Sequence, residues 1–251
     1  MQRDDIHREG RMRITLLTQC YNEETMLTYF LTYYEPWVDL IVFVDGNSND
    51  GTNEIIRNCK KGVRRVRDTG GLVDDEDRMI VRNTYWQEFR GDTDWFVFVD
   101  PDEFVYHPCR NVRGIIAASE QAGVQLIQCE GYRMIGNETP PLWSDLTKVI
   151  CMGVRDTDYE KPALWKSDIE PKFSYGGHYV GNKIEFKTNA SMMLLHYKHL
   201  SLSWIEQRIK RTQMSPRNYE LKQGFGHDGR EGKDFWMDQH EDTLRRAVRI
   251  I

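Results

Sequence analysis

Hydrophobic residues in the first half of the chain form short continuous runs separated by amphipathic segments. The runs at residues 14–20, 40–46 and 95–99 predict strands that are buried on both faces of a sheet. Between the first two runs, apolar residues recur at helical spacing until Pro36 ends the pattern. Further helices are predicted over 76–90 and 111–122, and a further strand over 124–129. This alternation predicts an α/β fold with a mostly parallel central sheet flanked by helices.

The second half of the chain has a different pattern. Residues 132–180 show weak periodicity with scattered Pro, Gly, Trp and Tyr, which predicts long ordered loops. Residues 190–200 predict a late strand, and residues 201–213 have the spacing of an amphipathic helix. We therefore expect one main domain over 1–200 and a short helical C-terminal extension over 201–251 that packs on it.

Composition narrows the class of protein. The 251 residues suit one α/β domain, and the five cysteines form no CxxC pair, which favours reduced thiols in a cytoplasmic protein. No apolar stretch is long enough to cross a bilayer, so membrane insertion is not expected. The net charge of −5 disfavours a nucleic-acid partner, although the basic run at 57–67 keeps that alternative open as a patch for a phosphate-rich acceptor.

Acidic side chains follow the predicted strands. Asp45 ends the second strand, and Asp100 and Asp102 come directly after the strand at 95–99. Ligands of open α/β sheets bind beyond the carboxyl ends of the strands. Two acids at this spacing repel each other unless a cation lies between them, and hard oxygen ligands suit Mg²⁺ or Mn²⁺ bridged to phosphates. The alternative is an ordinary Asp-Pro turn, and the preceding apolar strand together with Asp45 favours the metal–diphosphate site.

Histidine and lysine residues supply further candidates. His196 lies at the end of the late strand, where it is a candidate to complete the metal site. His178 follows two glycines in a loop, and Lys161 lies in the loop region. Both are candidates for contacts with the acceptor or the diphosphate.

Several common catalytic motifs are absent from the sequence. It contains no GxSxG elbow, no P-loop and no GxGxxG fingerprint after the first strand. A serine hydrolase, a P-loop kinase and a dinucleotide-dependent dehydrogenase are therefore not indicated. Nucleotidyltransferases usually have a glycine-rich basic loop after the first strand, whereas here the segment is YNEETM, which is acidic and contains no glycine.

Three motifs together resemble the GT-A fold glycosyltransferases, and within them the family 2-like group. LTQCYNEE resembles the opening strand and turn of the family, VFVDGNSNDGT its D-x-S-x-D-G-T segment, and the stretch from VRN to DPDEF its A-R-N … D-x-D-E-F element. The resemblance covers about residues 12–200. It implies a GT-A (nucleotide-diphospho-sugar transferase) fold, a nucleotide-sugar donor of the UDP type, and a Mn²⁺ or Mg²⁺ ion at the DxD motif.

The resemblance also implies roles for individual residues, with Asp102 as the more direct metal ligand. The implied donor-binding residues are Tyr21, Asn22, Glu23, Asp45, Arg82, Asn83 and Asp100, and the implied metal ligands are Asp100, Asp102 and His196. The catalytic base is where this chain departs from the family, because GGH replaces the usual GGF and no E-D pair follows. Asp168, Glu170 and Glu185 are the candidates for a base that reaches the acceptor hydroxyl, and inverting and retaining mechanisms both stay open.

The sequence thus predicts a hexosyl- or pentosyltransferase that moves a sugar from a nucleotide-diphosphate donor to an acceptor hydroxyl. Two alternatives keep a similar core. One is a phage-type glycosyltransferase that acts on a modified base in DNA, and the other is a nucleotidyltransferase.

Overall fold

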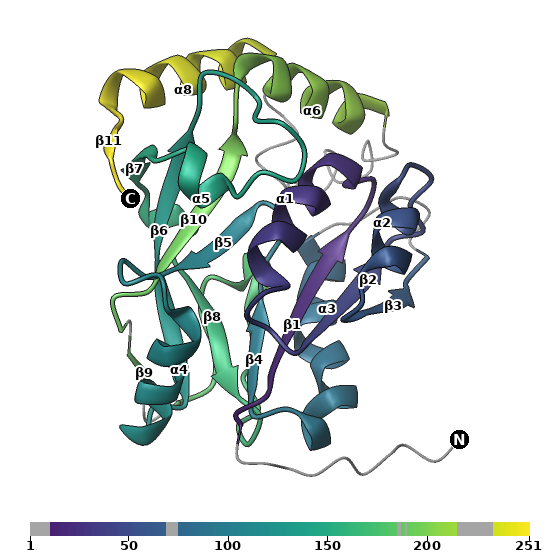
Figure 1. The fold of residues 1–251 in the computed structure, drawn as a ribbon, viewed down its shortest axis with the longest axis vertical. Coiled ribbons are helices and arrows are strands. Elements are labelled where there is room, and N and C mark those ends of the chain that lie inside the picture. Colours follow the sequence, from purple (N-terminus) through teal and green to yellow (C-terminus); the bar gives the residue numbers. More distant parts are fainter. Residues whose placement is uncertain (1–10, 69–74, 185–186, 189, 215–232) are drawn as a thin grey trace.

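The computed structural model describes residues 11–68, 75–184, 187–188, 190–214 and 233–251 (Figure 1). Within these residues, the strands form one mixed sheet with helices against it. The predicted α/β class with a central sheet flanked by helices is therefore confirmed. No helix in these ranges is both long and apolar enough to cross a bilayer.

The N-terminal half of the sheet is parallel, with the strand order β3-β2-β1-β4. Its strands are β1 (Ile14–Cys20), β2 (Leu40–Asp45), β3 (Gly62–Val66) and β4 (Trp95–Phe98). Every residue of β1 and β4 is buried, as expected for strands that are covered on both faces. In the register, Cys20 lies beside Asp45 and Leu17 beside Phe98. The carboxyl ends of the three strands thus meet at one edge of the sheet.

The other half of the sheet is mixed. β8 (Lys161–Lys166) runs antiparallel between β4 and β6 (Leu126–Ile135), and β10 (Met193–His199) pairs antiparallel with β5 (Glu103–Tyr106) and parallel with β6. The remaining strands are β7 (Met152–Arg155), β9 (Lys187–Thr188) and β11 (Val248–Arg249). Several of these strands follow one another without a crossover helix, so antiparallel pairing is available to them. A parallel set of strands, of which β4 leads into the DPDE turn, is thus followed along the chain by a mixed set.

Helices cover the sheet and one of its ends. α1 (Glu24–Tyr34) buries Leu27, Phe30 and Tyr34 in the same cluster as β1 and β4. The other helices are α2 (Thr52–Asn58), α3 (Asp75–Thr84), α4 (Val112–Gln121), α5 (Leu146–Val149), α6 (Leu202–Met214) and α8 (Lys233–Arg246), with 3₁₀ turns η1 (Tyr85–Asp92), η2 (Thr157–Tyr159) and η3 (Tyr175–Gly177). α6 and α8 lie across the top of Figure 1. Trp204 of α6 packs in a buried cluster with Tyr197 and Leu200, which fixes α6 to the end of β10.

Candidate active site

A tight turn carries the acidic motif from β4 into β5. The backbone N–H of Glu103 donates to the carbonyl oxygen of Asp100 at 3.0 Å, and Pro101 takes the second position, where its fixed φ suits such a turn. The backbone N–H of Asp100 donates in return to Oε2 of Glu103 at 2.9 Å. The backbone N–H of Tyr197 in β10 donates to the carbonyl oxygen of Asp102 at 2.8 Å. The turn is therefore held in one conformation from within and from β10.

Lys161 neutralises one side of this acidic turn. Its Nζ contacts Oε1 of Glu103 and lies 3.5 Å from Oδ2 of Asp100, and both Lys161 and Glu103 are buried. Burial opposes ionisation of Asp100, but Lys161, Arg78 and Arg82 outweigh it and lower the pKa of Asp100 to about 2. Burial also opposes the charge of Lys161, and the two acids overcome it and raise the pKa of Lys161. Lys161 was predicted to contact the acceptor or the diphosphate. In the structure it pairs with Glu103 and Asp100.

Asp102 contacts two side chains from the C-terminal part of the chain, Arg208 and His196. Its Oδ2 lies 2.6 Å from Nη1 of Arg208 in α6, and its Oδ1 lies 3.3 Å from Nε2 of His196 in β10. Burial opposes ionisation of this carboxyl as well, yet His196 and Arg208 lower the pKa of Asp102 well below its usual range. The structure therefore brings Asp102 and His196 together, as the sequence predicted.

Arg208 is a site residue that the sequence pattern did not indicate. It lies 106 positions from Asp102 in the chain, on a helix whose polar face looks like any solvated face. Only the packing of α6 on β10 brings it to the turn. In the sequence, the only feature of Arg208 that points to this role is its position on a predicted helix shortly after His196. Many surface arginines lie in comparable positions.

The arrangement of these side chains limits how a metal ion can be held. Within the described part of the chain, no group of three or more His, Cys, Asp and Glu side chains is arranged to hold a metal ion. Nε2 of His196 faces Asp102, and its buried Nδ1 has no hydrogen-bond partner among the described residues. Asp100 and Asp102 are ionised and offer hard oxygen ligands, so they fit Mn²⁺ or Mg²⁺ provided that phosphate oxygens complete the coordination.

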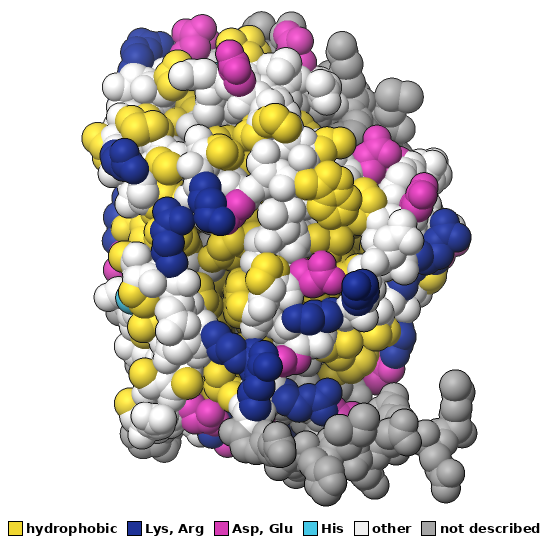
Figure 2. All heavy atoms as spheres, in the orientation of Figure 1, with side chains coloured by type: hydrophobic (Ala, Val, Ile, Leu, Met, Phe, Trp, Pro, Cys, Tyr) yellow, Lys and Arg dark blue, Asp and Glu magenta, His cyan; other side chains and the backbone are white. Residues whose placement is uncertain are grey.

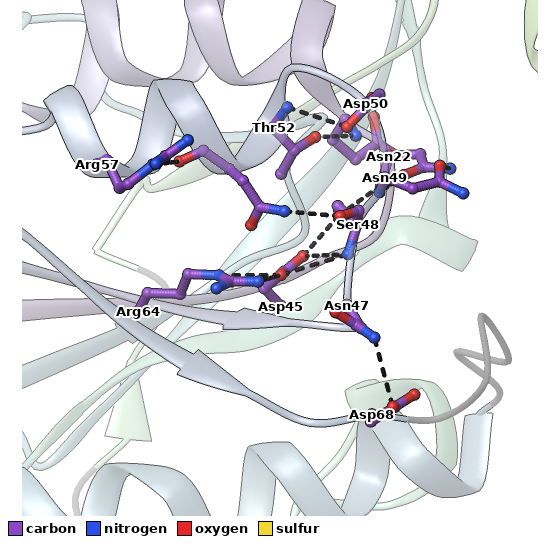
Figure 3. A network of polar contacts seen from close by, with 12 residues as sticks. Asn22, Asp45, Asn47, Ser48, Asn49, Asp50, Thr52, Arg57, Arg64 and Asp68 are labelled. Atoms are coloured by element: carbon purple, nitrogen blue, oxygen red, sulfur yellow. Dashed lines mark hydrogen bonds and ion pairs between the residues drawn. The ribbon is translucent and has the colours of Figure 1, made fainter.

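Asp45 is buried at the end of β2 and binds within the protein (Figure 3). Its Oδ2 accepts from Nη2 of Arg64 at 2.5 Å, and its Oδ1 accepts from the hydroxyl of Ser48 at 2.5 Å and from the backbone N–H of Ser48 at 3.1 Å. The role implied for Asp45 was a contact with the base or ribose. In the structure its carboxylate instead closes the turn that follows β2.

The loops after β1 and β2 form one polar unit. Asn22 has a left-handed backbone (φ 55°), which Asn tolerates better than most residues, and its N–H donates to the hydroxyl of Ser48 at 2.9 Å. The side chain of Asn22 exchanges two hydrogen bonds of 2.9 Å with Asn49 (Figure 3), and the N–H of Glu23 donates to the hydroxyl of Thr52 at 2.8 Å. Tyr21 precedes them and is half-buried. This unit lies one to two strand spacings, roughly 5–10 Å, from the acidic turn after β4.

Arg82 is buried close enough to Asp100 and Glu103 to feel their charges, with only 4% of its surface exposed. Its guanidinium stacks over the ring of Phe98 at 4.3 Å, and its Nη1 has no hydrogen-bond partner among the described residues. Burial lowers the pKa of Arg82, against the opposing effect of Asp100 and Glu103. The side chain of Asn83 accepts from the N–H of Phe173 at 2.9 Å and donates to its carbonyl oxygen at 3.1 Å. Both residues were predicted near the donor; in the structure Arg82 packs on Phe98 at the end of β4, and Asn83 binds the backbone of Phe173.

The GGH segment closes over Arg82. Gly176 and Gly177 have φ values of 66° and 71°, and a side chain at Gly177 would overlap the guanidinium of Arg82. His178 follows, with its Nδ1 3.4 Å from the carbonyl oxygen of Glu160, the residue before Lys161. The loop therefore brings His178 to the Lys161 side of the site, where an acceptor or diphosphate contact was predicted.

The candidates for the catalytic base do not gather at this edge. β8 runs antiparallel to β4 with Lys166 opposite Trp95, so Asp168 lies at the other end of the sheet, about 16 Å along β4 from Asp100. Glu170 is exposed, and its carbonyl oxygen accepts from the side chain of Asn182 at 3.1 Å. Glu185 lies outside the described residues. Asp168 is thus not positioned to serve an acceptor bound at the acidic turn.

Ion pairs neutralise three of the six cations in the basic run at 57–67. Arg64 pairs with Asp45, Arg65 with Glu88, and Arg67 with Asp77. The Nζ of Lys61 donates to two backbone carbonyl oxygens, those of Glu35 and Val38. Hydrogen bonds to carbonyl oxygens do not remove the charge of Lys61, so the alternative of a phosphate-rich acceptor stays open. A hollow of about 470 Å³ beside α4 lies away from all of these residues.

Comparisons with known proteins give structural similarities at low identity. No protein-family model and no curated protein matches the sequence. Glucosyl-3-phosphoglycerate synthase from Mycobacterium tuberculosis, in complex with Mn²⁺, UDP and phosphoglyceric acid, is 18% identical with a TM-score of 0.33, over 49% of this chain and 44% of that chain. Mannosyl-3-phosphoglycerate synthase from Rubrobacter xylanophilus is 15% identical with a TM-score of 0.31, over 52% of this chain and 43% of that chain.

A third structure, a candidate nucleotide-diphospho-sugar transferase from Desulfovibrio desulfuricans G20, is 8% identical with a TM-score of 0.39, over 94% of this chain and 98% of that chain. This chain spans less than half the length of the two synthases. With identities below 20% and TM-scores below 0.5, these similarities say nothing about the activity of this chain, which has to be argued from its own residues.

Proposed function

We propose that this chain is a metal-dependent glycosyltransferase that moves a sugar from a nucleotide-diphosphate donor, of the UDP-sugar type, to an acceptor hydroxyl. The observation that carries the proposal is the pair of ionised acids, Asp100 and Asp102, directly after a buried parallel strand. They end at the same sheet edge as the polar loops after β1 and β2. That edge is where open α/β sheets bind their ligands.

The proposed metal site uses Asp100 and Asp102 together with phosphate oxygens of the donor. When bound, Mn²⁺ or Mg²⁺ would neutralise charge on the leaving diphosphate. The protein keeps both acids ionised at neutral pH, Asp100 through Lys161 and Asp102 through His196 and Arg208. Lys161 and Arg208 bring positive charge to the two sides of the turn, which favours binding of a diphosphate despite the acids. The polar unit of Asn22 and Asn49 would form the wall of the nucleotide pocket.

Donor binding is expected to depend on the metal. In a thermal-shift screen, a UDP-sugar should raise the Tm of the protein with Mn²⁺ present and have little effect after EDTA, since a ligand that binds only the folded state stabilises it. The released product separates the alternatives, because a glycosyltransferase releases a nucleoside diphosphate and a nucleotidyltransferase releases pyrophosphate. GDP-sugars and nucleoside triphosphates serve as controls. Stabilisation by no nucleotide sugar, with or without Mn²⁺, would overturn the proposal.

Arg208 is proposed to bind the diphosphate from α6. Arg208→Met is expected to weaken UDP binding in the presence of Mn²⁺ by about 10-fold or more, because a hydrogen bond to a charged group contributes about 1.5–3 kcal/mol. Isothermal titration with UDP measures this effect. Arg246→Met is the matched control, because Arg246 forms an exposed ion pair with Asp242 on α8.

The same titrations distinguish a purely structural role for Arg208. If Arg208 only neutralises Asp102, its replacement would strengthen Mn²⁺ binding and leave the UDP affinity unchanged. That result would contradict a diphosphate contact. It would leave the assignment of the two acids intact, because the metal affinity itself reports on them.

A further inference from the structure

The segment between β6 and α5 exposes two large apolar side chains. Leu142 is 57% exposed and Trp143 is 56% exposed. Trp143 also has a left-handed backbone with φ 65°, which is uncommon for a bulky residue and costs free energy. Folding alone gains little from placing an exposed tryptophan in this conformation, and exposed apolar side chains that lie together mark interaction sites.

Hydrogen bonds from two helices hold this segment in place. The hydroxyl of Tyr29 in α1 donates to the carbonyl oxygen of Pro140 at 2.6 Å, and the N–H of Trp143 lies 3.3 Å from the hydroxyl of Thr28. The hydroxyls of Thr139 and Ser201 are 2.6 Å apart, which ties the segment to the start of α6. Leu142 and Trp143 are therefore presented on a braced loop.

The two helices that brace the loop also reach the proposed donor site. α1 begins directly after Asn22 and Glu23, about 6 Å along the helix from Thr28. α6 carries Arg208, about 10 Å along the helix from Ser201, and Arg208 contacts Asp102. Figure 1 shows the loop after β6 passing between α1 and α6, and Figure 2 shows hydrophobic side chains gathered over the middle of this face. The loop that carries the exposed pair and the proposed donor site are thus connected through α1 and α6.

The charge and side-chain types of the loop indicate which class of acceptor it can bind. Residues 136–145 contain Glu138 and Asp145 and no lysine or arginine, so the loop disfavours a polyanion such as DNA. An indole ring offers a flat apolar face and one N–H donor. A pyranose ring matches it, because its C–H faces are apolar and its hydroxyls lie around the rim. The hydroxyl of Ser144 lies next to the exposed pair in the chain.

We propose that Leu142 and Trp143 form an acceptor subsite that stacks a neutral saccharide, so that the acceptor is a glycan of at least two sugar units. This inference rests on the proposed function, since it names the acceptor of the same site. The reacting sugar would lie at the acidic turn, and the preceding sugar would lie on Trp143.

Trp143→Ala is expected to weaken binding of the saccharide and leave the donor side unchanged. The probes are maltotriose, cellotriose and chitotriose, observed by saturation-transfer difference NMR in the presence of UDP and Mn²⁺. At least one trisaccharide should bind the wild type, and its affinity should fall about 10-fold in Trp143→Ala, with partial recovery in Trp143→Phe. The UDP signal should be the same in all three proteins. Leu142→Ser is a second variant with a smaller change in the loop.

Each other outcome identifies what has failed. If UDP does not bind the wild type, the proposed function fails. If UDP binds but no trisaccharide does, or if Trp143→Ala keeps full trisaccharide affinity, the acceptor subsite is wrong and the donor site stands. Analytical sedimentation of the wild type and Trp143→Ala tests whether a second copy of the chain binds to this patch instead. If the wild type is a dimer that the substitution dissociates, the patch is a self-association face and the proposal is overturned.

Discussion

Asp102→Asn is expected to lower metal-dependent turnover of the donor by about 10²–10³-fold, the range for removing one preorganised electrostatic contact from an active site. The substitution keeps the size of the side chain and removes its negative charge. It deprives a divalent ion of an anionic oxygen ligand, and it leaves Arg208 beside a neutral amide. Release of nucleoside diphosphate from a UDP-sugar, measured across a series of Mn²⁺ concentrations, reports the effect.

The matched control for this substitution is Asp168→Asn. Asp168 is exposed at the opposite end of β8, and its carboxylate lies 3.5 Å from Nζ of Lys166. Turnover should be unchanged in this variant, because the residue does not reach the acidic turn. Full metal-dependent turnover by Asp102→Asn, with Asp168→Asn equally active, would remove the basis of the proposed enzyme.

The second large effect is expected on stability. Lys161→Met should lower the free energy of unfolding by about 3–5 kcal/mol, the range for breaking a buried ion pair by removing one partner. The substitution leaves Glu103, which is fully buried, without its cation, and it also removes the nearest positive charge from Asp100. Urea unfolding followed by tryptophan fluorescence measures the change, and the slope m should stay the same if the native state is intact.

The double variant Lys161→Met with Glu103→Gln tests the cause of this loss. The amide introduced by Glu103→Gln can still accept from the N–H of Asp100, but it carries no charge that needs a partner. Much of the lost stability should therefore return, since replacing a buried pair by neutral groups is often close to neutral. A decrease below about 1 kcal/mol in the single variant, or no recovery in the double variant, would show that Lys161 is not the counter-charge of Glu103.

Several elements could be predicted from the sequence because their signals are local. The runs at 14–20, 40–46 and 95–99 coincide with β1, β2 and β4 to within one residue at each end. Strands covered on both faces are continuously apolar, and this pattern does not depend on the rest of the fold. The acidic turn follows from chain adjacency, because residues that directly follow a buried strand must emerge at the end of that strand.

Other elements could not be predicted, because their patterns are short and are completed by distant partners. Residues 132–180 were expected to be loops, yet β6 continues to Ile135, and β7 and β8 lie in this stretch. β8 has six residues and is a strand because β4 and β6 supply hydrogen bonds on both sides. Strand formation depends on such neighbours more than on intrinsic preference.

By itself the sequence determined the α/β class, the parallel pairing of the first strands, and the two acids that follow β4. Only the tertiary structure decided which charges surround those acids. Lys161 reaches them from β8, His196 from β10, and Arg208 from α6. It also decided that Asp45 binds Arg64 and Ser48, and that Asp168 lies at the far end of the sheet. The physical reason is that hydrophobic periodicity acts along the chain, whereas an ion pair depends on the distance between atoms that folding brings together.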